Sequence, residues 1–280
     1  MDVRNEMQID TAAVRGALTA SIRDELRRSG YQRAVLGVSG GIDSAVVCYL
    51  AAEALGPQNV LALTLPYASS SSASLADALA VIAAIGVRHE HVEITPMVDP
   101  LFAALPDMDR RRKGNAMARM RMIVWYDRSE SFCGLVMGTG NKTEILLGYS
   151  TLHGDSACAL APIGDLYKTQ VRQLAADLSV PETVRLKPPT ADLWPGQTDE
   201  GELGLTYVEA DSILYLLFER ALAPEEVVGM GFARQQVRRV CDLVRRSQYK
   251  RCLTPIAKVS THTVGQEIAA GRDACFWPDW

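Results

Sequence analysis

Long apolar stretches are missing from this 280-residue chain: no run approaches the roughly 18 apolar residues that a membrane-spanning helix needs. The first ten residues, MDVRNEMQID, lack the apolar core of a signal peptide and are too acidic for a transit peptide. The six cysteines are scattered, with no CxxC pair and no spacing typical of a zinc site. These absences argue against a disulfide scaffold and a membrane protein, and we expect a reduced, cytoplasmic enzyme.

A strong positive charge is also missing. With 29 Lys and Arg against 33 Asp and Glu the net charge is −4, so no global basic field predicts a nucleic-acid partner. The apolar fraction of 48% and the charged fraction of 22% are close to the average of soluble globular proteins. A chain of this size buries a sizeable core without disulfides or metals. We therefore expect neither nucleic acid nor membrane among its partners.

Short apolar segments alternate with helix-length segments through the first half of the chain. Strands are expected at 34–38, 60–65, 87–94 and 135–137, and helices at 11–28, 43–55, 74–85, 115–128 and from about 141. Strands that alternate with helices in this way pair in parallel through right-handed crossovers. We therefore predict an α/β fold with a doubly wound, mainly parallel, Rossmann-like sheet. Its ligand is expected at the carboxyl ends of the strands, where the strand order reverses.

The pattern changes after about residue 165 to helices alone, expected at 168–179, 203–221 and 233–247. The pair Pro188-Pro189 rules out a continuous helix between the first two of them. The polar stretch from Trp194 to Gly204 is expected to be a loop or a disordered segment. We therefore predict one domain over 1–280, with an α/β nucleotide-binding core at about 30–165 and a helical extension at about 166–280.

The most informative segment follows an expected strand and precedes an expected helix, and it reads Gly37-Val38-Ser39-Gly40-Gly41-Ile42-Asp43-Ser44. Glycines allow the backbone to approach a ligand closely, and the N-terminus of the helix presents free N–H groups to an anion. The segment is not a Walker A loop, because it lacks the lysine that would reach the β- and γ-phosphates. The alternative is a plain strand-to-helix turn with Ser and Asp as caps. The complete octapeptide at this position favours the phosphate-binding loop.

The octapeptide resembles the pyrophosphate loop of the ATP pyrophosphatases, which cleave ATP to AMP and pyrophosphate while adenylating an acceptor. Further segments narrow the resemblance to the NAD synthetase family: KGN at 113–115, ARMRM at 118–122, GTGNKTE at 138–144 and PPTADL at 188–193. The segments GD at 154–155, QTDE at 197–200 and YKR at 249–251 add to it, in the same order over nearly the whole chain. The resemblance implies the fold of the adenine nucleotide α-hydrolases and a ligase that forms a carbon–nitrogen bond.

The resemblance assigns ATP binding to the octapeptide and to three residues outside it, which are Thr139, Lys168 and Thr190. It assigns Mg²⁺ to Asp43 and Glu144, and carboxylate oxygens of this kind suit that ion. Asp43 and Lys168 are the residues that it implies in catalysis. ATP then acts as a co-substrate and Mg²⁺ as the cofactor.

Three of these residues also have a plain structural interpretation. Asn141 and Glu144 have the spacing of a capping box, in which Glu144 serves only the start of a helix. Lys168 has the alternative of an ordinary surface lysine, and Thr190 that of a helix cap. Capping and metal binding by Glu144 are compatible, so both stay open.

For the acceptor, deamido-NAD, the resemblance implies Arg119, Tyr249 and Lys250, and Tyr249 stands where some relatives have His. Arg119 and Arg121 lie two residues apart, and therefore about 200° apart around a helix. One site does not easily use both, so we expect Arg121 to be structural.

Two positions depart from the family. Many bacterial members carry a Lys two residues before the Gly of Gly154-Asp155 and an Asp four residues after the Asp, and both contact the dinucleotide. This chain has Leu152 and Ala159 at those positions. We therefore expect either a different acceptor pocket or a different acceptor, and an unchanged ATP site.

The implied reaction is the ATP-dependent amidation of deamido-NAD to NAD by ammonia, through an adenylated carboxylate, with release of AMP and pyrophosphate. The resemblance also implies a homodimer that binds the dinucleotide near its subunit interface. The apolar faces of 11–28 and 205–221 suit such an interface or a buried core equally well. Only 36 residues precede Gly37 and they predict one helix, so we expect no glutaminase domain, unless a separate subunit supplies the ammonia.

Two other functions share the loop. An adenylating RNA-modifying enzyme would carry a basic surface and, as a rule, zinc or catalytic cysteines, which the charge and the scattered cysteines oppose. A non-catalytic ATP-binding sensor would not need both Asp43 and Glu144.

Overall fold

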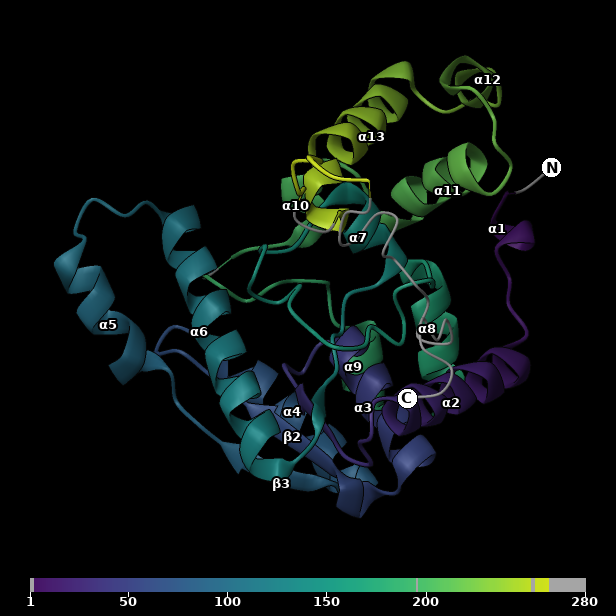
Figure 1. Ribbon diagram of the computed structural model, residues 1–280. Coiled ribbons are helices and arrows are strands. Elements are labelled where there is room, and N and C mark those ends of the chain that lie inside the picture. The colour runs from purple at the N-terminus through teal and green to yellow at the C-terminus, as the bar shows by residue number, and fades with distance from the viewer. Residues whose placement is uncertain (1–2, 195, 253–254, 262–280) are drawn as a thin grey trace.

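Four parallel strands form the central sheet, in the spatial order β3-β2-β1-β4. They are β1 (Ala34–Gly37), β2 (Val60–Thr64), β3 (Arg88–His91) and β4 (Leu135–Val136). The computed structural model describes residues 3–194, 196–252 and 255–261 (Figure 1). The chain steps outward from β1 to β3 and then returns to place β4 on the other side of β1, so the strand order reverses beside β1. The predicted doubly wound parallel sheet is confirmed.

The burial of the inner strands explains why the sheet could be predicted from the sequence. Strand β2 is buried along its whole length, and β1 is buried up to Gly37. A parallel strand that is covered by helices on both faces needs apolar side chains on both. Strand β3 reads Arg-His-Glu-His and is exposed, because it lies at the edge of the sheet, where charged residues oppose pairing with another chain.

One face of the sheet is covered by α2 (Thr11–Arg28), α3 (Ile42–Leu55), α4 (Ser72–Ile85), α8 (Lys168–Asp177) and α9 (Glu182–Leu186). Asp10 caps α2 by accepting a hydrogen bond from Ala13 N at 3.0 Å. Ile22 and Leu26 of this helix are buried against α3 and α8. The apolar face predicted at 11–28 therefore serves the core, which is the second of the two alternatives.

The other face of the sheet is covered by α5 (Thr95–Ala104) and α6 (Arg110–Phe132). Helix α6 extends five residues before and four residues after the predicted 115–128, because Asp109 caps it and Cys133 ends it in a left-handed conformation. Helix α5 was not predicted, since Pro96 and Pro100 obscure its periodicity. Together the two helices form the outer layer on the left of Figure 1.

The described residues after 165 contain helices and no strand, as predicted. With α7 (Lys142–Leu147), the helices α10 (Asp199–Leu203), α11 (Tyr207–Phe218), α12 (Pro224–Gly229) and α13 (Arg234–Arg246) form a second apolar core, at the top of Figure 1. The single helix predicted at 203–221 is wrong. Gly204 has a φ of +73° and ends α10, and Thr206 caps α11 through its bond from Glu209 N. Helix α10 also replaces part of the loop predicted from Trp194 to Gly204.

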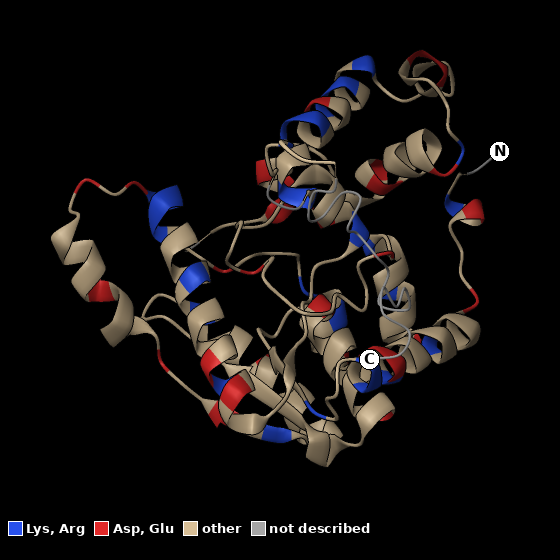
Figure 2. Ribbon diagram, viewed as in Figure 1, with Lys and Arg blue, Asp and Glu red and all other residues tan. Residues whose placement is uncertain are grey.

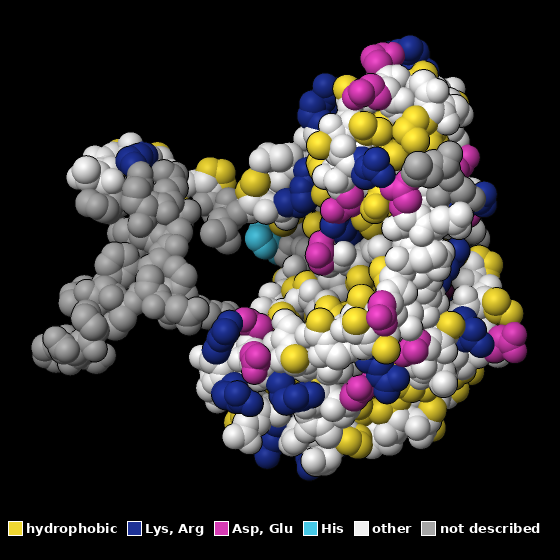
Figure 3. Space-filling model, turned by 90° about the vertical axis from the view of Figure 1, so that its right-hand side faces the viewer, with side chains coloured by type: hydrophobic (Ala, Val, Ile, Leu, Met, Phe, Trp, Pro, Cys, Tyr) yellow, Lys and Arg dark blue, Asp and Glu magenta, His cyan; other side chains and the backbone are white. Residues whose placement is uncertain are grey.

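Three short elements complete the described chain: α1 (Val3–Glu6), η1 (Pro57–Asn59) and η2 (Gln248–Arg251). Among the described residues, no helix combines the length and apolar character needed to cross a membrane. Lys and Arg alternate with Asp and Glu over the helices in Figure 2, and the face drawn in Figure 3 carries both signs among scattered apolar side chains. Five cysteines within the described ranges are free thiols, and Cys275 lies outside those ranges.

Candidate active site

The turn between β1 and α3 is held together by its own serines. Ser44 Oγ accepts from Ser39 N at 3.1 Å and donates to Gly41 O at 2.9 Å. Gly41 occupies the N-cap position of α3, and no side chain in the described part of the chain caps it. The first N–H groups of α3 therefore remain available to an anion at the carboxyl edge of the sheet, as a phosphate-binding loop requires.

Gly40 is the residue of this loop that least tolerates a side chain. Its φ is +81°, and a Cβ built on it would lie 2.1 Å from the carbonyl oxygen of Ser74 in α4. Gly40→Ala is expected to raise the KM for ATP at least tenfold and to lower the Tm, because the loop must move away from α4. Steady-state kinetics and thermal unfolding measure both effects.

Gly16→Ala is the matched control for that prediction. Gly16 lies inside α2 with nothing within 4 Å of a built Cβ. Alanine at this position is expected to leave the KM for ATP unchanged and to stabilise the helix by up to about 1 kcal/mol. Equal ATP kinetics in both variants would contradict the assigned role of the loop.

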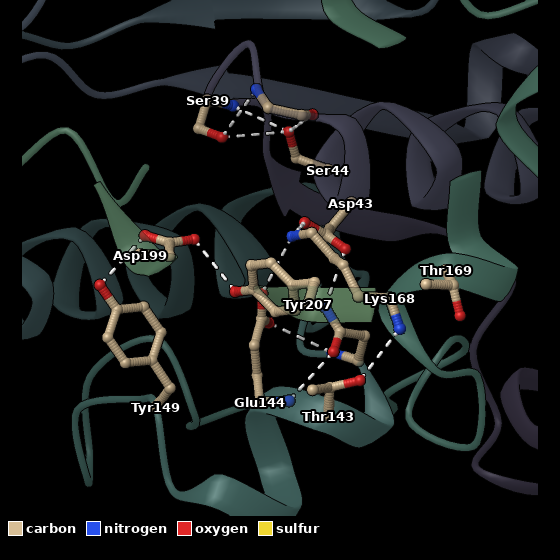
Figure 4. A network of polar contacts seen from close by, with 12 residues as sticks. Ser39, Asp43, Ser44, Thr143, Glu144, Tyr149, Lys168, Thr169, Asp199 and Tyr207 are labelled. Atoms are coloured by element: carbon tan, nitrogen blue, oxygen red, sulfur yellow. Dashed lines mark hydrogen bonds and ion pairs between the residues drawn. The ribbon is translucent and has the colours of Figure 1, made fainter. Parts of the chain in front are cut away.

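Three predicted residues meet beside the loop (Figure 4). Lys168, the first residue of α8, places its Nζ 2.5 Å from Asp43 Oδ2 and 3.1 Å from Glu144 Oε1. Lys168 is 2% exposed, so the alternative of an ordinary surface lysine is wrong. Burial lowers the pKa of Lys168, but the charges of Asp43 and Glu144 outweigh burial and raise this pKa above its usual value. The ammonium group is therefore charged.

Asn141 connects α7 to this cluster. Its side-chain Oδ1 accepts from Glu144 N at 3.0 Å, and its backbone N–H donates to Glu144 Oε2 at 3.4 Å. The predicted capping box is therefore confirmed. Its Nδ2 also donates to Asp43 Oδ1 at 2.9 Å. Glu144 Oε1 is left for Lys168, so capping and membership of the cluster coexist. The spacing of Asn141 and Glu144 revealed the cap, whereas no sequence signal revealed the contact with Asp43, which is 98 residues away.

A third carboxylate lies close to the cluster, and the sequence assigned it no role. Asp199 of α10 accepts from the hydroxyl of Tyr207 at 3.1 Å and from that of Tyr149 at 3.0 Å. The Tyr207 ring also lies 4.9 Å from Lys168 Nζ, at a distance typical of a cation–π contact. The charge of Asp199 acts on both Glu144 and Lys168. Asp199 thus adds a third carboxylate near the ammonium group. Burial raises the pKa of Glu144 to about 7 and also raises the pKa of Asp199, and a bound cation would favour the charged form of both.

The donor atoms fit Mg²⁺. Asp43 and Glu144 present carboxylate oxygens beside the N-terminus of α3, where phosphates would approach. Mg²⁺ is usually held by one or two carboxylates and completed by phosphate oxygens and water. Within the described ranges no group of three or more His, Cys, Asp or Glu is arranged to hold a metal ion.

A cavity of about 880 Å³ extends from this cluster along the carboxyl edge of the sheet. Nearly all predicted site residues line it: Gly37, Val38, Ser39, Gly41, Ile42, Asp43, Ser44, Arg119, Thr139, Glu144, Lys168, Thr190, Tyr249 and Lys250. Gly40 is the exception, because it faces α4 instead. Apart from Gly40, the predicted site residues therefore line one continuous cavity, and their roles stay predictions.

Arg119 and Arg121 both line this cavity, and the expectation that only Arg119 serves the acceptor stays a prediction. Arg119 donates from Nε and Nη2 to Leu152 O at 3.3 and 3.2 Å, and Arg121 donates from Nε to Leu65 O at 2.9 Å. Helix α6 runs along the cavity wall, and two long side chains reach the same wide space from its two flanks.

Thr190 lies at the rim of the cavity in a loop that contacts α4. Thr190 Oγ1 accepts from Asp192 N at 3.1 Å, and Asp192 in turn accepts from Ser71 N at 3.0 Å. No helix starts at Thr190, so its alternative as a helix cap is wrong. Lys187 fixes the same loop by donating to Ser74 and Asp77 of α4, both at 2.9 Å. Lys187 also lines the cavity, and the sequence did not single it out.

The C-terminal residues of the site come from η2. Lys250 Nζ donates to the carbonyl oxygens of Gly148 at 2.8 Å and Ser150 at 2.5 Å, while Tyr249 is 59% exposed. Leu152 lines the cavity and offers its carbonyl to Arg119, whereas Ala159 pairs its N–H with Val136 O. Backbone hydrogen bonds thus order the chain at Leu152 and Ala159, the two positions that differ from many bacterial members of the family.

Several known proteins are similar in sequence to this chain. A profile of the NAD synthase family matches residues 14–254 of this chain. The NH(3)-dependent NAD(+) synthetase of Trichlorobacter lovleyi is 51% identical over 269 residues, which cover 96% of this chain and 98% of that protein. The protein of the same name from Chlorobaculum tepidum is 47% identical over 267 residues, covering 95% and 96%.

Two solved structures share the fold over most of the chain. The NMN synthetase from Francisella tularensis has a TM-score of 0.80 at 31% identity and covers 89% of this chain and 99% of its own. The NH3-dependent NAD synthetase from Campylobacter jejuni, in complex with the nitrate ion, has a TM-score of 0.77 at 30% identity and covers 90% and 100%. On the profile and these relatives together, the chain belongs to the NAD synthase family.

Proposed function

We propose that this chain converts deamido-NAD to NAD by ATP-dependent amidation with ammonia. The observation that carries the proposal is the meeting of Asp43, Glu144 and Lys168 at the N-terminus of α3, in a member of the NAD synthase family. The curated relatives named NH(3)-dependent NAD(+) synthetase support the nature of the acceptor and the nitrogen source.

The reaction needs two steps because a carboxylate is a poor electrophile, with oxide as its leaving group. In the first, a nicotinate carboxylate oxygen attacks the α-phosphorus of ATP, the bond to the bridging oxygen breaks, and pyrophosphate leaves. In the second, neutral ammonia attacks the acyl carbon of the adenylate, AMP leaves, and the amide loses a proton. The protein contributes charge stabilisation and positioning rather than a covalent bond.

The ATP site in this proposal uses the loop Gly37–Ser44 with Thr139 and Thr190 around the nucleotide. The N–H groups at the start of α3 and the ammonium of Lys168 stabilise the negative charge that develops on the departing pyrophosphate. Mg²⁺, when bound by Asp43 and Glu144, supplies further positive charge to the phosphates.

The acceptor site in this proposal uses Arg119, Tyr249 and Lys250, which line the part of the cavity bordered by α6 and η2. Arg119→Ala is expected to raise the KM for deamido-NAD about 10- to 100-fold, the effect of losing one charge-assisted hydrogen bond. The KM for ATP should stay within about twofold, because the loop is untouched.

Arg112→Ala is the control on the same helix, because Arg112 pairs with Asp107 and does not line the cavity. It is expected to leave both KM values unchanged. A rise in the KM for ATP with Arg119→Ala, or no change in either KM, would contradict the assignment of Arg119.

We also propose that the described helices after residue 165 belong to one functional unit with the sheet. The site takes Asp43 from α3, Glu144 from α7, Lys168 from α8 and Asp199 from α10, so neither part contains it alone. The expected homodimer stays a prediction. Its interface would have to use surfaces other than the buried apolar faces of α2 and α11.

The test is an endpoint assay with ATP, Mg²⁺ and deamido-NAD, with ammonium or glutamine supplied in parallel. NAD and AMP from ammonium are expected, and product from glutamine alone would overturn the nitrogen source. Nicotinate mononucleotide is the second acceptor to supply, since the Francisella relative is named an NMN synthetase. If product forms with nicotinate mononucleotide and not with deamido-NAD, nicotinate mononucleotide is the acceptor.

The two other functions have less support. The profile that matches residues 14–254 is that of the NAD synthase family, so it gives no support to an RNA-modifying enzyme with this loop. A sensor without catalysis would not need the ammonium of Lys168 between two buried carboxylates. Absence of AMP formation with either acceptor, despite ATP binding, would favour the sensor.

A further inference from the structure

Asp211 of α11 is a buried carboxylate whose role the reaction does not explain. The residue is 0% exposed, and both of its oxygens accept hydrogen bonds from uncharged groups. Thr143 Oγ1 donates to Oδ1 at 2.5 Å, and Thr169 N donates to Oδ2 at 2.8 Å. Thr143 precedes Glu144 in the chain, and Thr169 follows Lys168. The two partners of Asp211 are therefore direct neighbours of two residues of the ion cluster.

The hydroxyl of Thr143 fixes the direction of this chain of bonds. It also accepts from the backbone N–H of Lys168 at 3.0 Å. A hydroxyl has a single proton, and here that proton goes to Asp211, so the order runs from Lys168 N through Thr143 to Asp211. The start of α7 and the start of α8 are thereby tied to each other and to α11.

Packing of α11 alone would not call for a carboxylate at this position, whereas α8 uses it, because Thr169 N is one of the first N–H groups of that helix and has no partner within the helix. Burying a carboxylate is costly, and an apolar residue is often as stable in such a place. The neighbours of Asp211 on α11, Ile213 and Leu214, are fully buried and apolar, so the helix packs by ordinary apolar contacts. What the carboxylate adds is two strong acceptors beside the cluster; burial raises the pKa of Asp211, and the charge of Lys168 opposes that rise.

We propose that Asp211 is a positioning residue: acting through Thr143, it sets the spacing between Glu144 and Lys168 that the binding of Mg²⁺ with ATP requires. This inference rests on the proposed ATP site. It predicts that breaking the chain at Thr143 weakens divalent-ion binding in the presence of the nucleotide and leaves the acceptor site intact.

The experiment compares Thr143→Val, Thr143→Ser and Asp211→Asn in the full chain. Binding of Mn²⁺ is measured by electron paramagnetic resonance in the presence of an ATP analogue with a non-hydrolysable α,β bond. Thr143→Val and Asp211→Asn are expected to raise the Kd for Mn²⁺ about tenfold or more, the usual effect of removing a group that orients a metal ligand. Thr143→Ser keeps the hydroxyl and is expected to match the wild type.

Kinetics and unfolding separate positioning from stability. Thr143→Val should lower kcat about tenfold while the KM for deamido-NAD stays within about twofold. Ser212→Ala is the control, because Ser212 lies next to Asp211 but its hydroxyl, among the described residues, bonds to Val208 O within α11. A lower Tm with an unchanged Kd for Mn²⁺ in Thr143→Val would overturn the proposal, and Thr143 decides the question even if Asp211→Asn does not fold.

The outcome also separates this proposal from the proposed reaction, since the Mn²⁺ measurement contains no acceptor. Suppose that Thr143→Val loses Mn²⁺ affinity and that the wild-type protein makes no NAD. That result would support the positioning role and refute the reaction. A wild-type protein that binds no Mn²⁺ with the analogue would overturn the positioning role.

Discussion

Asp43→Asn is expected to lower kcat about a thousandfold, with Glu144→Gln showing a loss of similar size. Each variant keeps the size of the side chain and removes one negative charge from the pair that we assign to Mg²⁺. Loss of a single group that stabilises transition-state charge costs about 100- to 1000-fold in turnover, and loss of a metal ligand is at the upper end. The measurement is kcat at saturating substrates over a titration of Mg²⁺, where higher Mg²⁺ should recover part of the activity.

The matched control for these variants is Glu53→Gln on the same helix. Glu53 lies in the last turn of α3 and pairs with Arg15 at the surface. Its replacement should change neither kcat nor the Mg²⁺ dependence. Turnover of Asp43→Asn at the wild-type level would remove the basis for the metal assignment.

The second large effect is expected for Lys168→Met, and it concerns stability as well as turnover. Lys168 is the ammonium group between two largely buried carboxylates, and methionine leaves both without it. Removing one partner of a buried ion pair costs about 3–5 kcal/mol, which for a chain of this size lowers the Tm by roughly 6–20 °C. Turnover should fall at least a hundredfold. Thermal unfolding and steady-state kinetics measure the two effects.

Mg²⁺ distinguishes this interpretation from a general loss of packing. A divalent ion between Asp43 and Glu144 replaces the lost charge, so Mg²⁺ should raise the Tm of Lys168→Met more than that of the wild type. Lys142→Met is the control, since Lys142 pairs with Asp165 and Glu219 nearer the surface and should cost about 1 kcal/mol or less. A Tm of Lys168→Met that is unchanged, or insensitive to Mg²⁺, would contradict the role of Lys168.

The sheet and the loop could be predicted from the sequence because their signals are local. Strands β1 and β2 are continuous apolar runs, and the octapeptide stands between a strand and a helix. The unpredicted helix α5 has the opposite character, with two prolines in ten residues. Gly204 shows the limit of periodicity: the apolar pattern continues through it, but its positive φ separates α10 from α11.

The sequence predicted which residues line the cavity, but it did not predict which of them contact one another. Lys168 reaches Asp43 across 125 residues, and no spacing rule encodes such a pair. The roles of Asn141 and Asp211 depend in the same way on packing between distant helices. The sequence alone did not show that Arg119 and Arg121 both line the cavity, because its width is a property of the whole fold.

The distance along the chain between these partners has a consequence for how the protein forms. Contacts between distant segments appear only after the loops that separate them have closed, which makes them slow to form. The sheet needs residues up to Val136, the ammonium group belongs to residue 168, and the carboxylate that bonds to Thr143 and Thr169 belongs to residue 211. A growing chain therefore completes its phosphate loop well before its ion cluster, and nucleotide chemistry begins only when most of the polypeptide has been made.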